Sequence, residues 1–347
     1  MEKIKVGILG ATGTVGQRFI QLLENHPWFE LTALAASKNS SGKTYEESVK
    51  GRWNISSDIP EYVRKIVVSE CYPEIDCSIV FSALDSSIAG EVETKFAEAG
   101  YFVFSNSRNH RMDKEVPLMV SEVNANHLEL VKSQNFDKGF IVTNPNCSTI
   151  GLVMALKPLQ DAFGIKSVQV TTQQALSGAG FPGVPPMEIQ GNVIPFIGGE
   201  EEKMETETQK ILGRYLANRI ENISYPISAQ CTRVPVKDGH LESVSISLDS
   251  NPSIDEIKNV FRNFNSLKDL NLPTAPNPPI EVREEDDRPQ PRLDVDLQKG
   301  MGATIGRLRT CPVVGYKFFV LTHNTIRGAA GASILNAELC YKKGLMG

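Results

Sequence analysis

The sequence predicts an α/β protein in which a doubly wound parallel sheet is followed by an α+β domain with a mixed sheet. Three observations support this class. Strand-like and helical segments alternate up to about residue 143, a glycine-rich turn follows the first strand directly, and longer amphipathic strands begin after residue 147. Alternation is typical of parallel sheets covered by helices on both faces, whereas amphipathic strands are typical of mixed or antiparallel sheets.

The first part of the chain contains six predicted strands. They lie at residues 3–9, 31–36, 63–68, 78–82, 101–105 and 140–143, with helical stretches between several of them. In sheets of this kind, ligands bind at the carboxyl ends of the strands. The turns that follow these strands are therefore the first places to look for functional residues.

The turn after the first strand carries three glycines in the pattern G-x-x-G-x-x-G. Gly10, Gly13 and Gly16 precede a helix with apolar residues at 19, 20, 22 and 23, and a β-rich segment returns at 31–36. Glycines here allow close approach of the backbone to a pyrophosphate at the helix N-terminus, as in a Rossmann-type βαβ unit. The pattern favours dinucleotide binding over a purely structural glycine turn.

The end of the second predicted strand bears on the choice of nucleotide. An NAD site usually places Asp or Glu there for the ribose 2′-hydroxyl, but this strand runs into Ser37, Lys38 and further polar residues. Hydroxyls and an ammonium group can bind a 2′-phosphate. The sequence thus favours NADP, although an ordinary polar loop has the same composition.

One cysteine lies where a strand meets a helix. Residues 144–149 read Asn-Pro-Asn-Cys-Ser-Thr, and a helix with apolar residues at 150, 153, 154 and 156 follows. Helix N-terminal amides favour a thiolate and can stabilise an oxyanion formed when sulfur attacks a carbonyl. Cys147 is therefore a candidate nucleophile, the alternative being a small buried hydrophobic residue.

The second part of the chain predicts strands at 165–172, 241–248, 304–308 and 316–321, with helices at 203–216 and 254–264. Residues 271–298 are rich in proline and charge, and they predict a long connection that either reaches a neighbouring subunit or forms a surface loop. A last helix at 327–341 contains small residues and is expected to pack back on the nucleotide domain. The predicted domains are 1–145 with 325–347 for NADP binding, and 146–324 for catalysis and dimerisation.

The composition narrows the class of protein. The 347 residues carry a formal charge of −5 with a pI near 5.7, which argues against nucleic acid or an anionic membrane as partner. Six scattered cysteines without C-x-x-C pairs suggest reduced thiols and a cytoplasmic location. We also expect no signal peptide, no membrane span and no metal site.

A cysteine nucleophile beside a nicotinamide points to aldehyde oxidation through a thiohemiacetal and a thioester. This chemistry needs a base, and the chain has five histidines. His26 and His127 lie at predicted helix ends, where charge complementarity or surface exposure explains them. His240 follows a Lys-Asp-Gly turn and starts a strand, which makes it the best-placed base, although a structural role for it stays open.

Several ordered motifs resemble the aspartate-β-semialdehyde dehydrogenase family, in its archaeal and fungal branch, over nearly the whole chain. Besides the glycine turn and the cysteine motif, Arg233 is followed seven positions later by His240. The remaining motifs are Ser-Asn-Ser-Arg-Asn-His-Arg-Met at 105–112, Gln-Ala-Leu-Ser-Gly-Ala-Gly at 174–180, Glu-Glu-Glu-Lys-Met at 200–204 and His-Asn-Thr-Ile-Arg-Gly-Ala-Ala-Gly at 323–331.

This resemblance implies a role for each matching residue. Cys147 is the implied acyl-thioester nucleophile, His240 the acid/base and Gln174 the group that orients the substrate. Arg233 is expected to bind the substrate α-carboxylate. The phosphate and the rest of the substrate are assigned to Arg111, Lys203, Glu200 and Asn146, with the choice among the glutamates at 200–202 left open. The NADP site is assigned to Gly10, Thr12, Gly13, Thr14, Val15, Gly16, Ser37, Lys38, Ser177, Gly178 and Asn324.

The implied activity is reductive dephosphorylation of L-aspartyl-β-phosphate to L-aspartate-β-semialdehyde, within the synthesis of lysine, threonine, methionine and isoleucine. The resemblance further implies a homodimer or a homotetramer. One alternative is a paralogous reductase of malonyl-CoA or another acyl-CoA. The other is a non-catalytic NADP-binding sensor, which would need the glycine turn but not Cys147, Gln174, Arg233 and His240 together.

Overall fold

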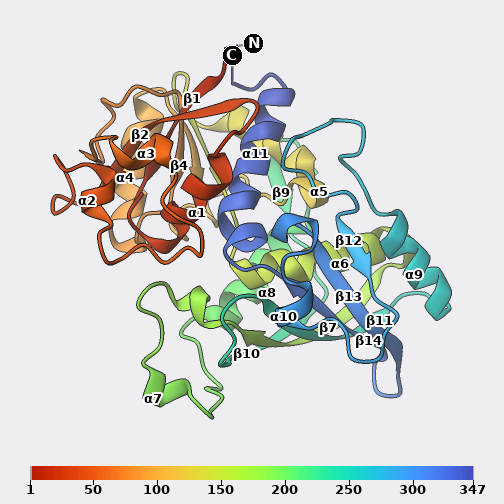
Figure 1. Ribbon diagram of the computed structural model, residues 1–347. Coiled ribbons are helices and arrows are strands. Elements are labelled where there is room, and N and C mark those ends of the chain that lie inside the picture. The colour runs from red at the N-terminus through yellow and green to blue at the C-terminus, as the bar shows by residue number, and fades with distance from the viewer. Residues whose placement is uncertain (1, 347) are drawn as a thin grey trace.

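The computed structural model describes residues 2–346 and contains two six-stranded sheets, one in each half of the chain (Figure 1). The first sheet is wholly parallel, and the second is mixed. The predicted fold class is therefore confirmed. Among residues 2–346, no helix is both long and apolar enough to cross a membrane.

The first sheet has the strand order β3-β2-β1-β4-β5-β6. From β1, the chain first adds β2 and β3 on one side of the sheet and then β4, β5 and β6 on the other side, so the strand order reverses between β1 and β4. Its strands are β1 (Ile4–Leu9), β2 (Phe29–Ala36), β3 (Ser69–Glu70), β4 (Ile79–Ser82), β5 (Phe102–Ser105) and β6 (Phe140–Thr143). The principal helices beside it are α1 (Thr14–Leu23) and α4 (Ser86–Glu98). A reversal of this kind leaves a crevice at the carboxyl ends of the two central strands, where dinucleotides bind.

The glycine turn joins β1 to α1 tightly. Gly10 has a φ of +78°, which an L side chain rarely adopts, and a Cβ on Gly16 would lie 2.4 Å from the carbonyl oxygen of Gly10. The amides of Gly10 and Ala11 both donate to the carbonyl of Ala35, at 2.9 and 3.0 Å. The turn is thereby held against the end of β2.

The predicted strand at 63–68 is wrong. Residues Glu61–Arg64 form the short helix α3, and only the following Ser69–Glu70 join the sheet, as β3. Pro60 precedes the helix, and Arg64 Nε lies 3.1 Å from Glu61 Oε2 one turn away. Proline and an acidic residue at a helix start favour the helix, and the valine-rich pattern concealed this signal.

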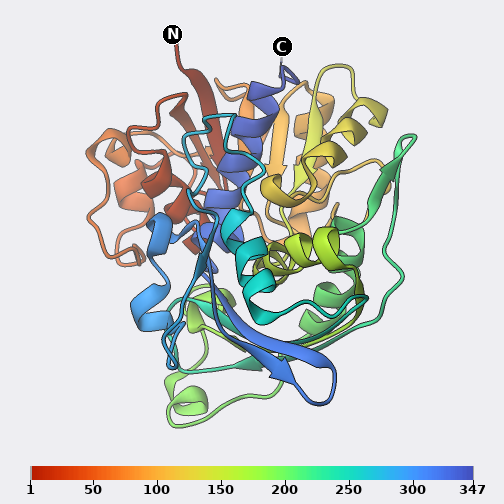
Figure 2. The same cartoon turned by 90° about the vertical axis from the view of Figure 1, so that its right-hand side faces the viewer.

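The second sheet has the order β10-β7-β11-β14-β13-β12, with α6 packed on it (Figure 2). Its strands are β7 (Ile165–Gln174), β10 (Ile227–Arg233), β11 (His240–Leu248), β12 (Ile280–Val282), β13 (Ala303–Cys311) and β14 (Gly315–Thr322). The longer helices of this half are α6 (Cys147–Phe163), α8 (Glu200–Ile211) and α9 (Ile254–Asn263). The shorter elements of the chain are α2 (Tyr45–Ser48), α5 (Ser121–Asn124), η1 (Ala125–Ser133), η2 (Leu176–Ala179), α7 (Pro186–Ile189), α10 (Pro291–Asp294) and η3 (Leu297–Gly300).

Two sequence predictions in this half need correction. The helix expected at 203–216 begins earlier and ends at Ile211, because Gly213 leads into a hairpin of β8 (Arg214–Leu216) and β9 (Arg219–Glu221). Ala217 and Asn218 turn the hairpin with φ of +44° and +68°. The connection at 271–298 is also not wholly irregular, since β12 pairs in parallel with β13.

The end of the chain returns to the first half. One π-helical turn, η4 (Ile326–Ala330), leads into α11 (Gly331–Lys342), whose residues Ile334, Leu335 and Leu339 share a core with β1, β2 and β4. Figure 1 shows this blue helix beside the red and orange segments. Arg327 is fully buried in η4, and its guanidinium holds both oxygens of Glu122 in α5, at 2.8 and 2.7 Å.

We predict that Arg327→Met destabilises the protein by about 3–5 kcal/mol, because it leaves Glu122 as an unpaired buried charge. The double variant Arg327→Met/Glu122→Leu should recover most of this loss. Urea unfolding followed by circular dichroism measures both. As a control, removing the exposed Lys95–Glu91 pair by Lys95→Met should shift the midpoint far less. Equal midpoints for Arg327→Met and the wild type would contradict the argument.

Candidate active site

Cys147 is the first residue of α6 and follows β6 after a three-residue connection. The side-chain oxygen of Asn146 caps the helix by accepting from the amides of Ser148 and Thr149, at 2.9 and 3.3 Å. Cys147 therefore lies at the carboxyl edge of the first sheet and at the N-terminus of a helix that packs on the second. The predicted transition from strand to helix at this cysteine is present.

Three predicted site residues lie side by side at one end of the second sheet. Arg233 pairs with Gln174 across β10 and β7, and Leu241 pairs with Gln173 across β11 and β7, which places His240 next to Gln174. All three side chains are buried on the same face. We call this set, with Thr322 opposite His240 on β14, the polar row.

The polar row meets the cysteine through His240. The Cys147 Sγ and His240 Nε2 atoms lie 3.2 Å apart, whereas the two residues are 93 positions apart in sequence. Burial lowers the pKa of His240 to about 3, and the neighbouring Arg233 acts in the same direction. Burial also raises the pKa of the Cys147 thiol to about 12, although Arg233 and Arg111 oppose this shift. Burial and Glu200 thus favour the thiol, whereas the two arginines and the helix N-terminus favour the thiolate.

The predicted phosphate-binding residues form one network around Asn146. Arg111 Nη1 donates to Glu207 Oε1 at 2.8 Å, and Glu207 Oε2 accepts the Asn146 amide at 2.7 Å. The Asn146 side chain donates to Glu200 Oε1 at 2.8 Å, and Lys203 lies 3.2 Å from the other oxygen of Glu200. Of the three consecutive glutamates, only Glu200 is buried in this network, while the side chains at 201 and 202 are exposed.

A cavity of about 310 Å³ joins the cysteine to the glycine turn. Its wall includes Cys147, Asn146 and Arg111 from one side and Thr14 and Val15 of α1 from the other. The predicted residues Ser177, Gly178 and Asn324 also line it, and Asn324 donates to Ser177 Oγ at 2.8 Å. The structure therefore brings the candidate nucleophile and the dinucleotide turn into one space.

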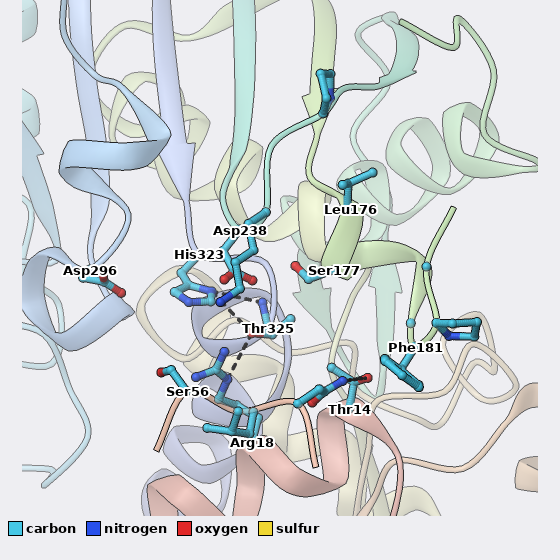
Figure 3. A pocket seen from close by; sticks show the side chains of 17 residues that line it. Thr14, Arg18, Ser56, Leu176, Ser177, Phe181, Asp238, Asp296, His323 and Thr325 are labelled. Carbon is cyan, nitrogen blue, oxygen red and sulfur yellow. Dashed lines mark hydrogen bonds between the residues drawn. The ribbon is translucent and has the colours of Figure 1, made fainter. Parts of the chain in front are cut away.

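A second cavity of about 510 Å³ adjoins the first and shares Thr14, Ser177, Gly180 and Thr325 with it (Figure 3). Arg18 of α1 enters it and donates to Thr325 Oγ1 at 3.1 Å, and His323 lies beside Thr325. Burial lowers the pKa of His323 to about 4. The two cavities together are lined by Thr14, Val15 and Arg18 of α1 and by residues that follow β7 and β14.

The other residues predicted to bind the nucleotide follow β1 and β2 of the first sheet. The glycine turn precedes α1, whose N-terminus has no side-chain cap, unlike that of α6. Its first-turn amides are therefore available to an anion. Ser37 and Lys38 are exposed just after β2 and lie outside the two cavities. The strand ends at Ala36, so Ser37 occupies the place where an NAD site usually has Asp or Glu.

Other residues at the site had no assignment from sequence. Asn106 follows β5 and lines the smaller cavity, and Glu207 bridges Arg111 to Asn146. Glu207 lies seven positions after Glu200 on α8, so helical spacing would have shown that the two share a face.

Two histidines outside the site, His26 and His127, are buried and not exposed. His26 lies 2.8 Å from Glu338, and His127 bonds the Gly213 carbonyl at 3.1 Å.

Comparison with known proteins gives matches in both halves of the chain. The family model "Semialdehyde dehydrogenase, NAD binding domain" matches residues 5–131, and "Semialdehyde dehydrogenase, dimerisation domain" matches residues 156–327. An aspartate-semialdehyde dehydrogenase of Archaeoglobus fulgidus is 53% identical over 98% of this chain and 99% of its own. A Candida albicans protein of the same name is 46% identical, with full coverage of both chains.

Solved structures agree with the sequence relatives. The crystal structure of aspartate semialdehyde dehydrogenase with NADP from Candida albicans has a TM-score of 0.91 at 43% identity, covering 99% of this chain and all of its own. The Vibrio cholerae enzyme II, solved with ASA, has a TM-score of 0.79 at 28% identity and covers 98% and 99%. With matches of this extent in sequence and structure, the chain belongs to the aspartate-semialdehyde dehydrogenase family.

Proposed function

We propose that this chain is an NADP-dependent aspartate-semialdehyde dehydrogenase that reduces L-aspartyl-β-phosphate to L-aspartate-β-semialdehyde and phosphate. The observation that carries the proposal is the 3.2 Å contact between Cys147 and the buried His240, because Cys147 also lines the cavity that reaches Thr14 and Val15 of the glycine turn. Relatives of this name that are 44–53% identical over nearly the whole chain support it. They do not favour an acyl-CoA reductase or a non-catalytic sensor.

The proposed roles follow from the chemistry of the side chains. The Cys147 thiolate attacks the acyl phosphate, phosphate leaves, and the substrate stays bound as a thioester on sulfur. NADPH, when bound, supplies the hydride that reduces this group. His240 acts as acid/base on the reacting oxygen or sulfur, Gln174 orients the acyl group, and the α6 amides stabilise the oxyanion.

The charged residues account for the anionic substrate. Arg233 offers a planar fork of donors to the α-carboxylate, and Arg111 with Lys203 binds the phosphate. Glu200 is close enough to Lys203 to order it and to receive the substrate ammonium. Asn146 holds this group of residues against α6. Local cations of this kind explain how a chain of net charge −5 can take an anionic substrate.

The residues of the first sheet fit a phosphorylated dinucleotide. The uncapped α1 N-terminus and the turn of Gly10, Thr12, Gly13, Thr14, Val15 and Gly16 receive the pyrophosphate. Ser37 and Lys38 would bind the 2′-phosphate, and Ser177, Gly178 and Asn324, which line the cavity beside Cys147, would hold the nicotinamide end. The NADP in the Candida albicans structure supports this choice of nucleotide.

The proposal extends to the organisation of the enzyme. Residues 1–145 with 325–347 form the NADP-binding domain, and 146–324 form the catalytic and dimerisation domain, in a homodimer or homotetramer. The family name of residues 156–327 supports a role in dimerisation. We place the enzyme in the cytoplasm, which agrees with six cysteines that are all free.

An assay of the purified enzyme tests the substrate. Aspartate-β-semialdehyde with phosphate and NADP should give NADPH absorbance, whereas malonyl-CoA with NADPH should give no turnover. Loss of activity when phosphate is omitted would identify the acyl acceptor. Turnover of malonyl-CoA but not of the semialdehyde would replace our proposal with the reductase alternative.

Replacing the Cys147 thiol should abolish turnover without changing the affinity for NADPH. Cys147→Ala is expected to lower kcat by about 10⁴-fold or more while the Kd for NADPH stays within about twofold, because the glycine turn is untouched. Stopped-flow turnover and fluorescence titration measure the two quantities. Cys311→Ala, in the β13–β14 hairpin, is the matched cysteine control. Substantial turnover by Cys147→Ala would remove the covalent mechanism.

The nucleotide preference should depend on Ser37. A carboxylate there repels a 2′-phosphate, so Ser37→Asp is expected to weaken NADPH binding on the order of 10- to 100-fold while NADH changes little. Titration with both nucleotides measures the ratio. Ser250→Asp, an exposed site between β11 and α9, controls for the added charge. An unchanged ratio would move the 2′-phosphate site away from β2.

A further inference from the structure

Both ring nitrogens of His240 have partners, and the two partners differ in kind. Nε2 faces the Cys147 sulfur at 3.2 Å, and Nδ1 lies 3.0 Å from the backbone nitrogen of Ala175. A backbone N–H can only donate a hydrogen bond. A neutral imidazole has one protonated nitrogen and one with a free lone pair, so the nitrogen that accepts from Ala175 must be the unprotonated one.

We propose that the Ala175 amide fixes His240 as its Nε2–H tautomer, so that this histidine serves the reaction as a hydrogen-bond donor to sulfur and oxygen and not as the base that deprotonates Cys147. Ala175 is the positioning residue, acting through its backbone. This inference rests on the proposed function for its meaning in catalysis, but the tautomer itself can be observed without turnover.

The Ala175 peptide is well placed for this role. Its carbonyl accepts from Arg233 Nη1 at 2.7 Å and from the Gly178 amide at 3.1 Å, so one residue is bonded to both His240 and Arg233. Ala175 is fully buried at the end of β7. A proton on Nδ1 would face the amide proton and leave a buried donor without a partner, which disfavours that form by about 10- to 100-fold.

The other charged groups around His240 also oppose its protonation. Arg233 lies beyond Gln174 in the polar row, and His323 follows β14 on the opposite side. Glu242, two residues further along β11, is fully buried, and burial raises the pKa of its carboxyl well above the usual value. Burial therefore favours the neutral carboxyl of Glu242, which does not stabilise an imidazolium by charge. Cys147 could do so only as a thiolate.

The proposed reaction can proceed with a donor alone. The thiol first loses its proton to solvent. Thiolate attack forms the C–S bond, and phosphate leaves with the electrons of the C–O bond. Hydride addition to the thioester carbon then gives an alkoxide, and its collapse breaks the C–S bond and returns the electron pair to sulfur. No step takes a proton from His240 permanently, and Nε2–H stabilises the negative charge on sulfur or oxygen throughout.

The direct test is long-range ¹H–¹⁵N NMR of ¹⁵N-histidine enzyme at pH 6–8. Only five histidines contribute, and loss of one signal in His240→Gln identifies His240. The expected pattern is a protonated Nε2 and an unprotonated Nδ1 throughout this range. A protonated Nδ1, in either the neutral ring or an imidazolium, would overturn the inference even if the enzyme is fully active. Inactivity with the expected tautomer would instead count against the proposed function.

A proline substitution removes the donor selectively. Ala175 has φ of −68° and ψ of 156°, which proline adopts without backbone change, and Gln174 before it is in a strand, as proline prefers. Ala175→Pro should remove the hydrogen bond to Nδ1. The ring can then carry its proton on Nδ1, which leaves Nε2 unprotonated and able to accept the proton of the Cys147 thiol. Ala175→Gly keeps the N–H and is the matched control, which should retain the wild-type tautomer.

Alkylation of Cys147 by iodoacetamide reads out this change. The experiment uses a Cys311→Ala background, because backbone amides lower the pKa of Cys311 and make it a competing target. In the parent enzyme, the rate should rise about tenfold per pH unit from 6 to 9 without an acidic plateau. Ala175→Pro should show a plateau and react at least about tenfold faster at pH 6.5.

Two outcomes of this experiment would overturn the inference: an acidic plateau in the parent enzyme, or a folded Ala175→Pro variant that keeps both the parent tautomer and the parent pH profile. If crowding by the proline ring prevents folding, the NMR pattern and the pH profile of the parent enzyme still decide the question.

Discussion

The site depends on the position of α6, which begins directly after the last strand of the parallel sheet and packs on the mixed sheet. Its first residue is therefore the point where the carboxyl edge of one sheet meets the polar row of the other. The Asn146 cap fixes the start of the helix, and the same side chain reaches Glu200 of α8. A shift of α6 by one residue would separate Cys147 from both His240 and the glycine turn.

The mixed sheet supplies reactive side chains to the site because its inward-facing polar residues gather at one end of the strands and its inward-facing apolar residues lie further along them. Arg233, Gln174 and His240 occupy the end near α6, and Ala229, Val170 and Val244 lie further along the same strands, in the core. Between them, Thr172 pairs with Glu242, whose two carboxyl oxygens have no hydrogen-bond partner among the described residues. The sheet register thus brings residues far apart in sequence into one site, and the core behind them keeps it rigid.

The sequence predicted the parts of the fold that short-range patterns determine. The alternation of strands and helices, the glycine turn and the start of α6 at Cys147 all depend on neighbouring residues. The error at 63–68 came from valines of which Val63 lies in a helix and Val67 in an isolated bridge. The strand β12 was missed because it has only three residues and directly follows two prolines. Pairing of distant strands has no local signal, so the contact of His240 with Cys147 could be inferred only through resemblance. The bonds from Glu207 and the Ala175 amide needed coordinates.

The carboxylates of the site explain how its cations remain available in a buried place. Arg111 and Lys203 each contact a glutamate, Glu207 and Glu200, while Arg233 contacts only the neutral carbonyl of Ala175 among its side-chain hydrogen bonds. Three cations and two carboxylates leave one net positive charge around Asn146 and Cys147. Burying cations without partners would be costly, whereas full pairing would leave no attraction for an anionic substrate. The partly neutralised network satisfies both requirements, and it leaves positive charge beside Cys147, where an acyl phosphate must bind.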